Sequence, residues 1–284
     1  MPSHIEYNLE NLTNAIVKQA AEDYRKALKG RGYDGKSPAK IIKEVEQFFH
    51  SKYFELLTTV KGDYLIERLK EEYEEEKKKM RVRLIQATPN PIETIAKIAS
   101  ICYDSDPKDP MKLVRHLYYN GHLSVFEHIY FTFKIEEISR ACSHQLVRHR
   151  HCSFTQRSQR YCSEDECTVI APRSILDKDE KGGYWELIET IGEHYRELQA
   201  LGIPNEDVRY LLPNACATEL YLSCNLRELI HIANERLCTK AQWEIRDLVR
   251  NMVSLVDPSL QFMLVPKCKS GRIICHTPCQ KKEG

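Results

Sequence analysis

A cluster of hydrogen-bond donors and cations occupies residues 148–161, with the sequence RHRHCSFTQRSQRY. The segment holds four arginines and two histidines but no carboxylate, and hydroxyl and amide side chains lie between the cations. Arginine forks bind phosphate through two parallel bonds, and hydroxyl and amide groups add directional bonds to sugars or bases. A solvated basic surface, a nucleic-acid grip and a pocket for phosphorylated small molecules all remain open. The interleaved donors favour the pocket.

The composition of the whole chain narrows these alternatives. Its 284 residues carry a formal net charge of only +1, which argues against bulk electrostatic binding to nucleic acid. A hydrophobic content of 42% with 29% charged residues is typical of a globular protein with a core. No stretch approaches the roughly 18 apolar residues of a membrane span, and no secretion signal is visible, so we expect a cytoplasmic protein. The eleven cysteines then predict free thiols rather than disulfides.

Two regions with different patterns must position the cluster. Residues 1–79 are predicted to be helical throughout and contain no catalytic set. From Met80 onward, alternating apolar residues predict strands over 80–87, 128–135 and 217–224. Helical spacing predicts helices over 90–103, 109–122, 138–150, 184–202, 226–237 and 240–256. Because this order lacks the regular alternation of a doubly wound sheet, we predict an α+β fold of helices and antiparallel strands, preceded by a small all-helical appendage.

Capping residues predict where several helices begin and end. Ser37 followed by Pro38 predicts the start of a helix, because proline is tolerated at the first helical position. Asn90 with Glu93 three residues later predicts a reciprocal capping box. Gly121 is expected to close the helix over 109–122 in a left-handed conformation.

Four segments of the chain resemble the flavin-dependent thymidylate synthases, the ThyX family. Arg-His-Arg at 148–150, followed by seven residues and Ser158, is similar to the RHRx7S signature of that family. The other three are GHLSVFEHIYFTF at 121–133, LLPNACATELYLSCNLREL at 211–229 and AQWEIR at 241–246. All four occur in family order, so we expect a synthase domain over residues 80–265. A helical extension over 1–79 and a cysteine-rich tail over 266–284 lie outside the resemblance.

The resemblance implies a transferase of nucleotide biosynthesis, a flavoprotein methyltransferase that makes dTMP from dUMP. Methylenetetrahydrofolate would donate the carbon, FAD would carry the hydride and NADPH would reduce the flavin. The family consists of homotetramers with active sites at subunit interfaces, so the implied partners are these small molecules and further copies of the chain, with no nucleic acid or membrane. Two alternatives remain: a related C5-methylase acting on UMP or another uridine nucleotide, and an RNA-binding or regulatory module.

The resemblance also implies roles for individual residues. Arg246 would stabilise negative charge on the uracil ring, and His122 would lie beside flavin and folate. The implied flavin ligands are Ser124, Arg148, His149, Arg150, Gln156, Asn234 and Arg236. The implied nucleotide ligands are Gln145, Arg148, Gln156, Arg157, Ser158, Gln159, Arg160 and Arg246. Glu219 departs from the basic residue that some family members carry, which leaves one phosphate contact unassigned.

The tail contains a second group of reactive side chains. Cys268, Cys275, His276 and Cys279 lie within twelve residues of one another. Cysteine and histidine bind zinc, but the spacing differs from the usual pairs of cysteines separated by two residues. We therefore assign no metal ligands from the sequence and expect reduced thiols in this tail.

Overall fold

The computed structural model of the chain describes residues 4–28, 36–77, 79–102, 108–164, 168–179 and 182–276. The chain divides into two compact units, residues 1–79 and residues 80–284, each with its own hydrophobic core. We describe each unit by itself.

The first unit is helical. It contains α1 (His4–Leu28), α2 (Pro38–Phe49), α3 (Lys52–Leu57) and α4 (Gly62–Lys77). Its core is aromatic: Tyr24, Phe49 and Phe54 are almost completely buried, and the rings of Phe49 and Phe54 meet edge to face with centroids 5.2 Å apart. Such a pair adds about 0.5–1.5 kcal/mol to the stabilisation from burial. The unit therefore has the means to fold around its own core.

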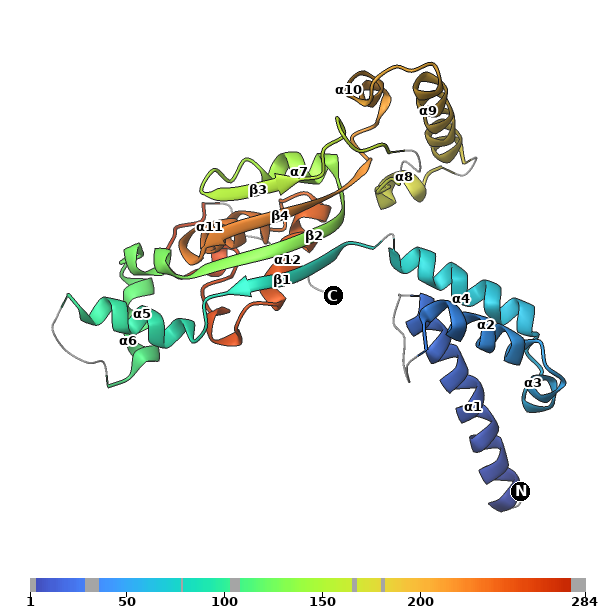
Figure 1. Cartoon of the computed structure of the whole chain (residues 1–284). Helices are drawn as coiled ribbons and strands as arrows, with labels where there is room; N and C mark the ends of the chain where they lie inside the picture. The colour runs from blue at the N-terminus through green and yellow to red at the C-terminus, as the bar shows by residue number, and fades with distance from the viewer. Residues whose placement is uncertain are drawn as a thin grey trace. The chain divides into compact units, whose positions relative to one another are not determined.

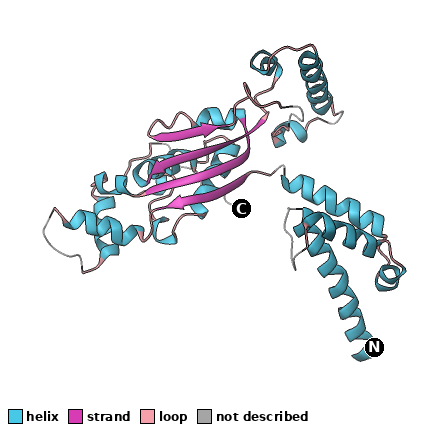
Figure 2. Cartoon of the chain, viewed as in Figure 1, coloured by secondary structure: helices cyan, strands magenta, loops and turns pink. Residues whose placement is uncertain are grey.

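The second unit is built on a four-stranded sheet (Figures 1 and 2). Its strands are β1 (Arg81–Ala87), β2 (Tyr130–Ser139), β3 (Cys152–Gln156) and β4 (Ala217–Asn225). They lie in the order β1-β2-β4-β3, and every neighbouring pair is antiparallel. Together with the helices of this unit, the sheet confirms the predicted α+β fold class.

Helices pack against one face of the sheet and extend beyond its two ends (Figure 1). The longest are α5 (Pro91–Ser100), α6 (Pro110–Tyr119), α9 (Gly183–Ala200), α11 (Leu226–Arg236) and α12 (Trp243–Ser254). Shorter ones are α7 (Arg140–Leu146), α8 (Arg173–Leu176), α10 (Asn205–Val208), and the 3₁₀ helices η1 (Ser124–His128), η2 (Arg209–Leu211), η3 (Pro258–Leu260) and η4 (Lys267–Lys269). Alternate residues of β2, such as Phe131 and Phe133, share the main core with Leu248 of α12. The residues between them, such as Lys134, face away from the core.

The structure corrects two local predictions and confirms others. The helix predicted over 138–150 ends at Leu146, and β3 follows it within the basic segment 148–161. Asn90 adopts a left-handed conformation (φ 45°) and its side chain makes no capping bond, so the capping-box prediction is wrong. Pro38 does begin α2, and Gly121 follows α6 with φ 79° as predicted.

No helix within the described residues is both long enough and apolar enough to cross a membrane.

Because the two units have separate cores, residues 80–284 should fold without residues 1–79. We expect the truncated protein to unfold cooperatively on heating, with circular dichroism reporting the transition. The full-length chain is the reference. Aggregation of the truncated protein, or a gradual loss of signal without a transition, would show that the helical unit is needed to complete the larger one.

Candidate active site

A tight turn between α7 and β3 presents the Arg-His-Arg signature. The hydroxyl of Ser139 accepts a hydrogen bond from the Cys142 backbone N–H at 3.0 Å and so caps α7. Buried Cys142 and Leu146 fix the helix against the core, and the backbone N–H of His149 donates to the Leu146 carbonyl after the helix ends. The turn consequently buries His149 and leaves its two arginine neighbours exposed.

His149 lies at the centre of a polar network at the side of α11. The Nε of Arg236 donates to His149 Nε2 at 3.0 Å, and an Nη of Arg236 donates to the Gln145 carbonyl at 3.3 Å. His149 Nδ1 lies 3.5 Å from a carboxylate oxygen of Glu228, and its ring meets that of His231 edge to face. This arrangement makes Nε2 the acceptor and directs the Nδ1 proton toward Glu228.

Burial sets the charge of the network. The His149 side chain is almost fully buried, and this burial, together with the Arg236 cation and His231, lowers its pKa to about 4. Burial also raises the pKa of Glu228. His149 is therefore neutral near pH 7 and positions Arg236 rather than contributing a charge.

A cavity of about 580 Å³ lies beside this network. Its walls come from the start of η1, from α11 and from the C-terminal segment, and they include His151, Glu228, His231, Asn234 and Arg272. Asn234 is 2% exposed; its Nδ2 donates to the Ile230 carbonyl, while its buried Oδ1 has no hydrogen-bond partner in the structure. A buried acceptor without a partner is costly, so Oδ1 is suited to receive a bond from a ligand in the cavity.

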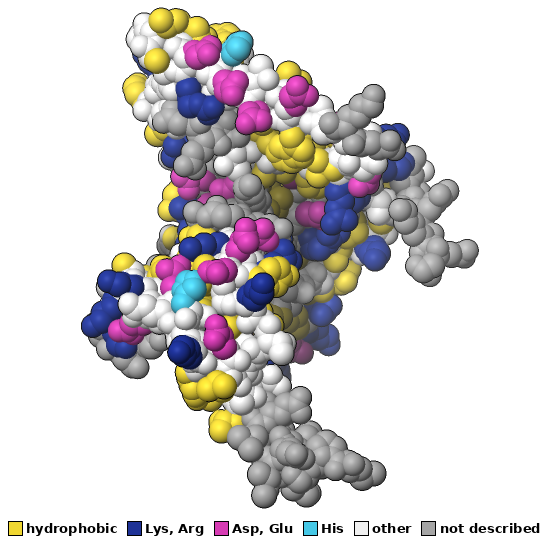
Figure 3. Space-filling model, turned by 90° about the vertical axis from the view of Figure 1, so that its right-hand side faces the viewer, with side chains coloured by type: hydrophobic (Ala, Val, Ile, Leu, Met, Phe, Trp, Pro, Cys, Tyr) yellow, Lys and Arg dark blue, Asp and Glu magenta, His cyan; other side chains and the backbone are white. Residues whose placement is uncertain are grey.

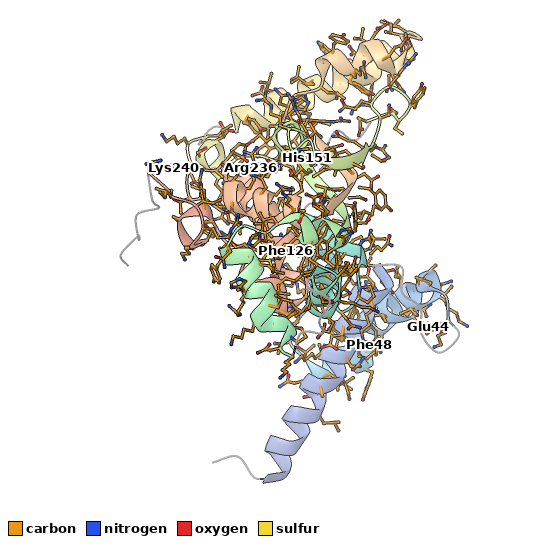
Figure 4. The ribbon with its side chains drawn as sticks, turned by 90° about the vertical axis from the view of Figure 1, so that its left-hand side faces the viewer. Glu44, Phe48, Phe126, His151, Arg236 and Lys240 are labelled. Carbon is orange, nitrogen blue, oxygen red and sulfur yellow. The ribbon has the colours of Figure 1, made fainter. Side chains whose placement is uncertain are left out.

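Unpaired cations lie in the wall of the cavity and on either side of His149. Arg148 and Arg150 are exposed, and neither forms an ion pair with a described residue. Arg272 is half-buried, with its guanidinium 4.8 Å from the centre of the Tyr118 ring, and no described carboxylate pairs with it either. Figure 4 labels His151 and Arg236, which contribute to the same region from the signature turn and from α11. The predicted residues His122 and Ser124 are exposed and flank Leu123, which lines the cavity.

The remaining predicted residues of the signature lie at the C-terminal end of β3 and just after it. Gln156 donates to the hydroxyls of Ser143 (3.0 Å) and Thr218 (3.2 Å), and the Ser158 hydroxyl accepts from the Arg160 backbone N–H. The Gln159 amide lies 3.6 Å from the sulfur of Cys216. These contacts hold the segment after β3 in a defined conformation.

Carboxylates pair with the two arginines of that segment. Arg157 contacts Glu164 at 3.2 Å and Glu219 at 4.0 Å, and Arg160 contacts Glu206 at 2.6 Å. Arg157 and Glu219 also line a second cavity of about 560 Å³, together with Glu137. Glu137 adopts φ 57° at an irregularity of β2, and burial raises the pKa of its carboxyl group.

Arg246 lies in a third position, in the first turn of α12. Its side chain is half-buried, and one Nη donates to the Thr239 carbonyl in the loop between α11 and α12 at 2.9 Å. The structure thus brings the predicted residues Gln145, His149, Asn234 and Arg236 together, and separately gathers residues 156–160. The two groups lie toward opposite ends of β3, and the bond from Gln156 to Ser143 of α7 connects them across the helix.

Three residues of the first group were not predicted from the sequence. Glu228 and His231 are three residues apart on α11, so both face the same side of the helix as Asn234 and meet His149 there. Polar residues at that spacing within the otherwise apolar stretch 228–234 were the available signal. Arg272 gave no signal, because only the folded C-terminal segment brings it to the cavity.

One trio of potential metal ligands lies in this network. Ligand atoms of His149, Glu228 and His231 all lie within 4.8 Å of one another. However, Arg236 donates into the Nε2 lone pair of His149, and its positive charge opposes a cation at that place. The geometry therefore favours an anionic ligand here.

Comparisons with known proteins show which family the chain matches. Residues 83–260 match the family described as thymidylate synthase complementing protein, Thy1. A flavin-dependent thymidylate synthase of Geobacter sulfurreducens is 38% identical over 208 residues, covering 68% of this chain and 90% of the relative. One of Pyrococcus furiosus is 40% identical over 190 residues, covering 61% and 78%.

A solved structure shares the fold. Thymidylate synthase X from Helicobacter pylori, solved with FAD and dUMP, superposes with a TM-score of 0.55 at 23% identity. The match covers 66% of this chain and 97% of that one.

The neutral, buried His149 predicts a loss of stability in acid. The unfolded chain takes up a proton on this histidine near pH 6.5, whereas the folded protein resists until about pH 4. The stabilisation is therefore complete above pH 6.5 and is lost as the pH falls toward 4. Between pH 7 and pH 5, the loss of this stabilisation should lower the free energy of unfolding by about 2 kcal/mol. Urea denaturation at the two pH values measures the change.

His149→Gln is the matched variant, because it keeps an acceptor for Arg236 but does not titrate. Glu228 works in the opposite direction, since its raised pKa adds stability as the pH falls, and it is present in both proteins. The variant should lose about 2 kcal/mol less than the wild type over this range. Equal losses would mean that His149 is not the titrating group.

Proposed function

The chain belongs to the flavin-dependent thymidylate synthase family, and from this membership we propose that it methylates dUMP to dTMP. Methylenetetrahydrofolate would supply the carbon and NADPH the reducing equivalents. The Helicobacter pylori protein of the same fold was solved with FAD and dUMP, which supports these two ligands for this chain.

The observation that carries the proposal is the set of unpaired cations on either side of His149 and in the wall of the neighbouring cavity. Arg148, Arg150 and Arg272 lack carboxylate partners within the described residues, and Asn234 offers a buried acceptor. Unpaired guanidinium groups suit the pyrophosphate of a dinucleotide, and a buried acceptor suits a ring N–H. The donor set therefore fits FAD, which when bound supplies hydride transfer.

We assign the binding of FAD to this group. Arg148 and Arg150 would contact phosphate oxygens, while His149 holds the Arg236 guanidinium in place through the bond to its Nε. Asn234 would contact the ligand in the cavity, and His122 would lie beside flavin and folate. Ser124 and Gln156 complete the proposed flavin ligands.

We assign the nucleotide to the group at the end of β3 together with three residues outside it. The proposed ligands in the group are Gln156, Arg157, Ser158, Gln159 and Arg160, and the other three are Gln145, Arg148 and Arg246. Arg160 contacts Glu206 through side chains that are both about half exposed, and exposed pairs of this kind stabilise by roughly 1 kcal/mol or less. A nucleotide phosphate can therefore replace Glu206 at little cost.

An uncovered face of the sheet supports an oligomeric assembly. The face of the sheet away from the core is not covered by helices of its own unit, and it exposes Tyr130 and Tyr221 (Figure 2). We propose a homotetramer with shared active sites.

Arg246 is the proposed catalytic cation. Methylation at C5 requires electron density to build up on the uracil ring, and a guanidinium near N3 and its neighbouring oxygen stabilises that charge. The bond from Arg246 to the Thr239 carbonyl fixes the side chain before the substrate arrives. A preorganised donor of this kind typically contributes ~3 kcal/mol to stabilisation of the transition state.

The decisive experiment measures dTMP formed from dUMP by the purified protein with FAD, NADPH and methylenetetrahydrofolate. We expect a yellow protein with flavin absorbance and turnover that requires all three additions. UMP is assayed in parallel, since turnover of UMP alone would reassign the substrate. A protein that cannot be loaded with FAD would contradict the proposal.

Arg246→Ala should slow methylation by roughly a hundredfold or more, because it removes one preorganised charge. Oxidation of the reduced flavin by oxygen should continue, which separates loss of the methylation step from loss of the cofactor. Arg250→Ala is the control, because Arg250 lies one helical turn further along α12 and pairs with Asp247 at the surface. Similar losses in both variants would point to damage to α12.

Arg272→Ala should weaken FAD binding by at least tenfold, because one charge-assisted bond is worth about 1.5–3 kcal/mol. The measurement is fluorescence titration of the flavin-free protein. Arg115→Ala is the matched control: its guanidinium also lies against an aromatic ring, 4.2 Å from the centre of Phe262, but it does not line the cavity. Equal affinities in the Arg272 variant and the wild type would remove Arg272 from the flavin site.

A further inference from the structure

A third cavity, of about 420 Å³, gathers cysteine and histidine side chains from distant parts of the chain. Cys238 comes from the loop between α11 and α12, while Cys268, Cys275 and His276 come from the C-terminal segment. The family match ends at residue 260, so three of these four residues lie outside it. We propose that they bind one zinc ion, which clamps the C-terminal segment onto the α11–α12 loop.

The fold of the C-terminal segment explains how Cys268 and Cys275 reach one cavity. Between them, the buried hydroxyl of Ser270 accepts from the backbone N–H groups of Arg272 and Ile273 and donates to the Lys267 carbonyl. Gly271 adopts φ 67° beside this hydroxyl, a conformation that favours glycine. The resulting turn reverses the chain, so residues on both sides of it line the same space.

The chemistry of the four side chains matches zinc. Three thiolates and one imidazole form a closed tetrahedral set typical of structural zinc sites. None of the nine cysteines in the described residues forms a disulfide. Cys279 lies outside the described residues and is not needed to complete four ligands.

Neighbouring charges also favour this site. A zinc ion with three thiolates and a neutral histidine carries a net charge of −1, and the cavity is lined by three cations, Arg236, Lys240 and Lys267, and one carboxylate, Glu235. Figure 4 labels Arg236 and Lys240 in this region. The excess of cations would stabilise the anionic centre, whereas at the His149 trio the adjacent arginine donates into one of the ligand atoms and repels an ion there.

Binding requires the ligands to move closer together. Within the described residues, His149, Glu228 and His231 are the only such group whose ligand atoms lie within 4.8 Å of one another, so the four side chains of this cavity stand further apart. Cys275 and His276 lie outside helices and strands, and His276 is exposed, so both can turn toward an ion. Metal binding and local ordering are commonly coupled in this way.

The zinc site would affect the candidate active site through the backbone of the loop between α11 and α12. Cys238 precedes Thr239, whose carbonyl accepts the bond from Arg246, and Asn234 and Arg236 line this cavity as well. A clamp at Cys238 would hold that carbonyl in place. The ion itself would contact neither substrate nor flavin, so its role is structural.

The test is the metal content of the full-length protein, purified under reducing conditions without chelators and incubated with zinc before desalting. We expect about one zinc ion per chain by elemental analysis. Cobalt substituted for zinc should give the intense sulfur-to-metal absorption of a tetrahedral thiolate site. Cys268→Ser and His276→Ala should each lose most of the zinc, while circular dichroism shows that both variants remain folded.

Two controls make the result specific. Cys102→Ser removes an exposed cysteine far from the cavity in sequence and should keep the zinc. His231→Ala tests the competing trio and should also keep it. Absence of zinc from the wild type would overturn the proposal, as would zinc lost from His231→Ala but kept in Cys268→Ser. Neither result bears on flavin binding or turnover, which the assays above decide separately.

Discussion

One buried pair, Glu244 with Ser139, joins the two halves of the candidate site. The Glu244 carboxylate accepts from both the backbone N–H and the hydroxyl of Ser139 at 2.6 Å, and both residues are almost fully buried. Ser139 ends β2 and caps α7, which leads to the signature turn. Glu244 lies two residues before Arg246 on α12. These two side chains therefore fix the start of α7, which leads to the Arg-His-Arg turn, and the start of α12, which carries the proposed catalytic arginine. A donor left unpaired at this place would cost roughly 1–3 kcal/mol.

Within the Arg-His-Arg signature, the buried residue positions a neighbouring side chain, and the two exposed residues are the proposed binding groups. His149 is neutral, donates no charge and holds Arg236, while the arginines on either side of it remain exposed and unpaired within the described residues. A rigid buried centre between two exposed cations reduces the entropy that each must lose on meeting a phosphate. The run of three residues is thus one structural anchor flanked by two proposed binding groups.

The sequence predicted the elements whose patterns are local. Alternation found β1, β2 and β4, and Gly121 was recognised because a helix that ends in a left-handed residue favours glycine. β3 was missed because its five residues lie between basic residues that drew attention to binding, and its strand character depends on pairing with β4. Arg272 could not be placed from the sequence, since it reaches the cavity only through the fold of the C-terminal segment. The resemblance supplied the roles of individual residues, and the fold alone showed that those residues fall into separate groups.

The arrangement of carboxylates answers how a chain of net charge +1 can hold so many cations in one segment. Beyond β3, Glu164 and Glu219 neutralise Arg157, and Glu206 neutralises Arg160. Acidic and basic side chains are likewise interspersed over the face that Figure 3 shows. Such exposed pairs are weak, so they suppress nonspecific attraction to polyanions yet give way to a phosphate that brings several bonds at once. The unpaired arginines before β3 have no such competitor. A small anionic ligand that fits the cavity is therefore favoured over a long polyanion, which needs a continuous basic surface.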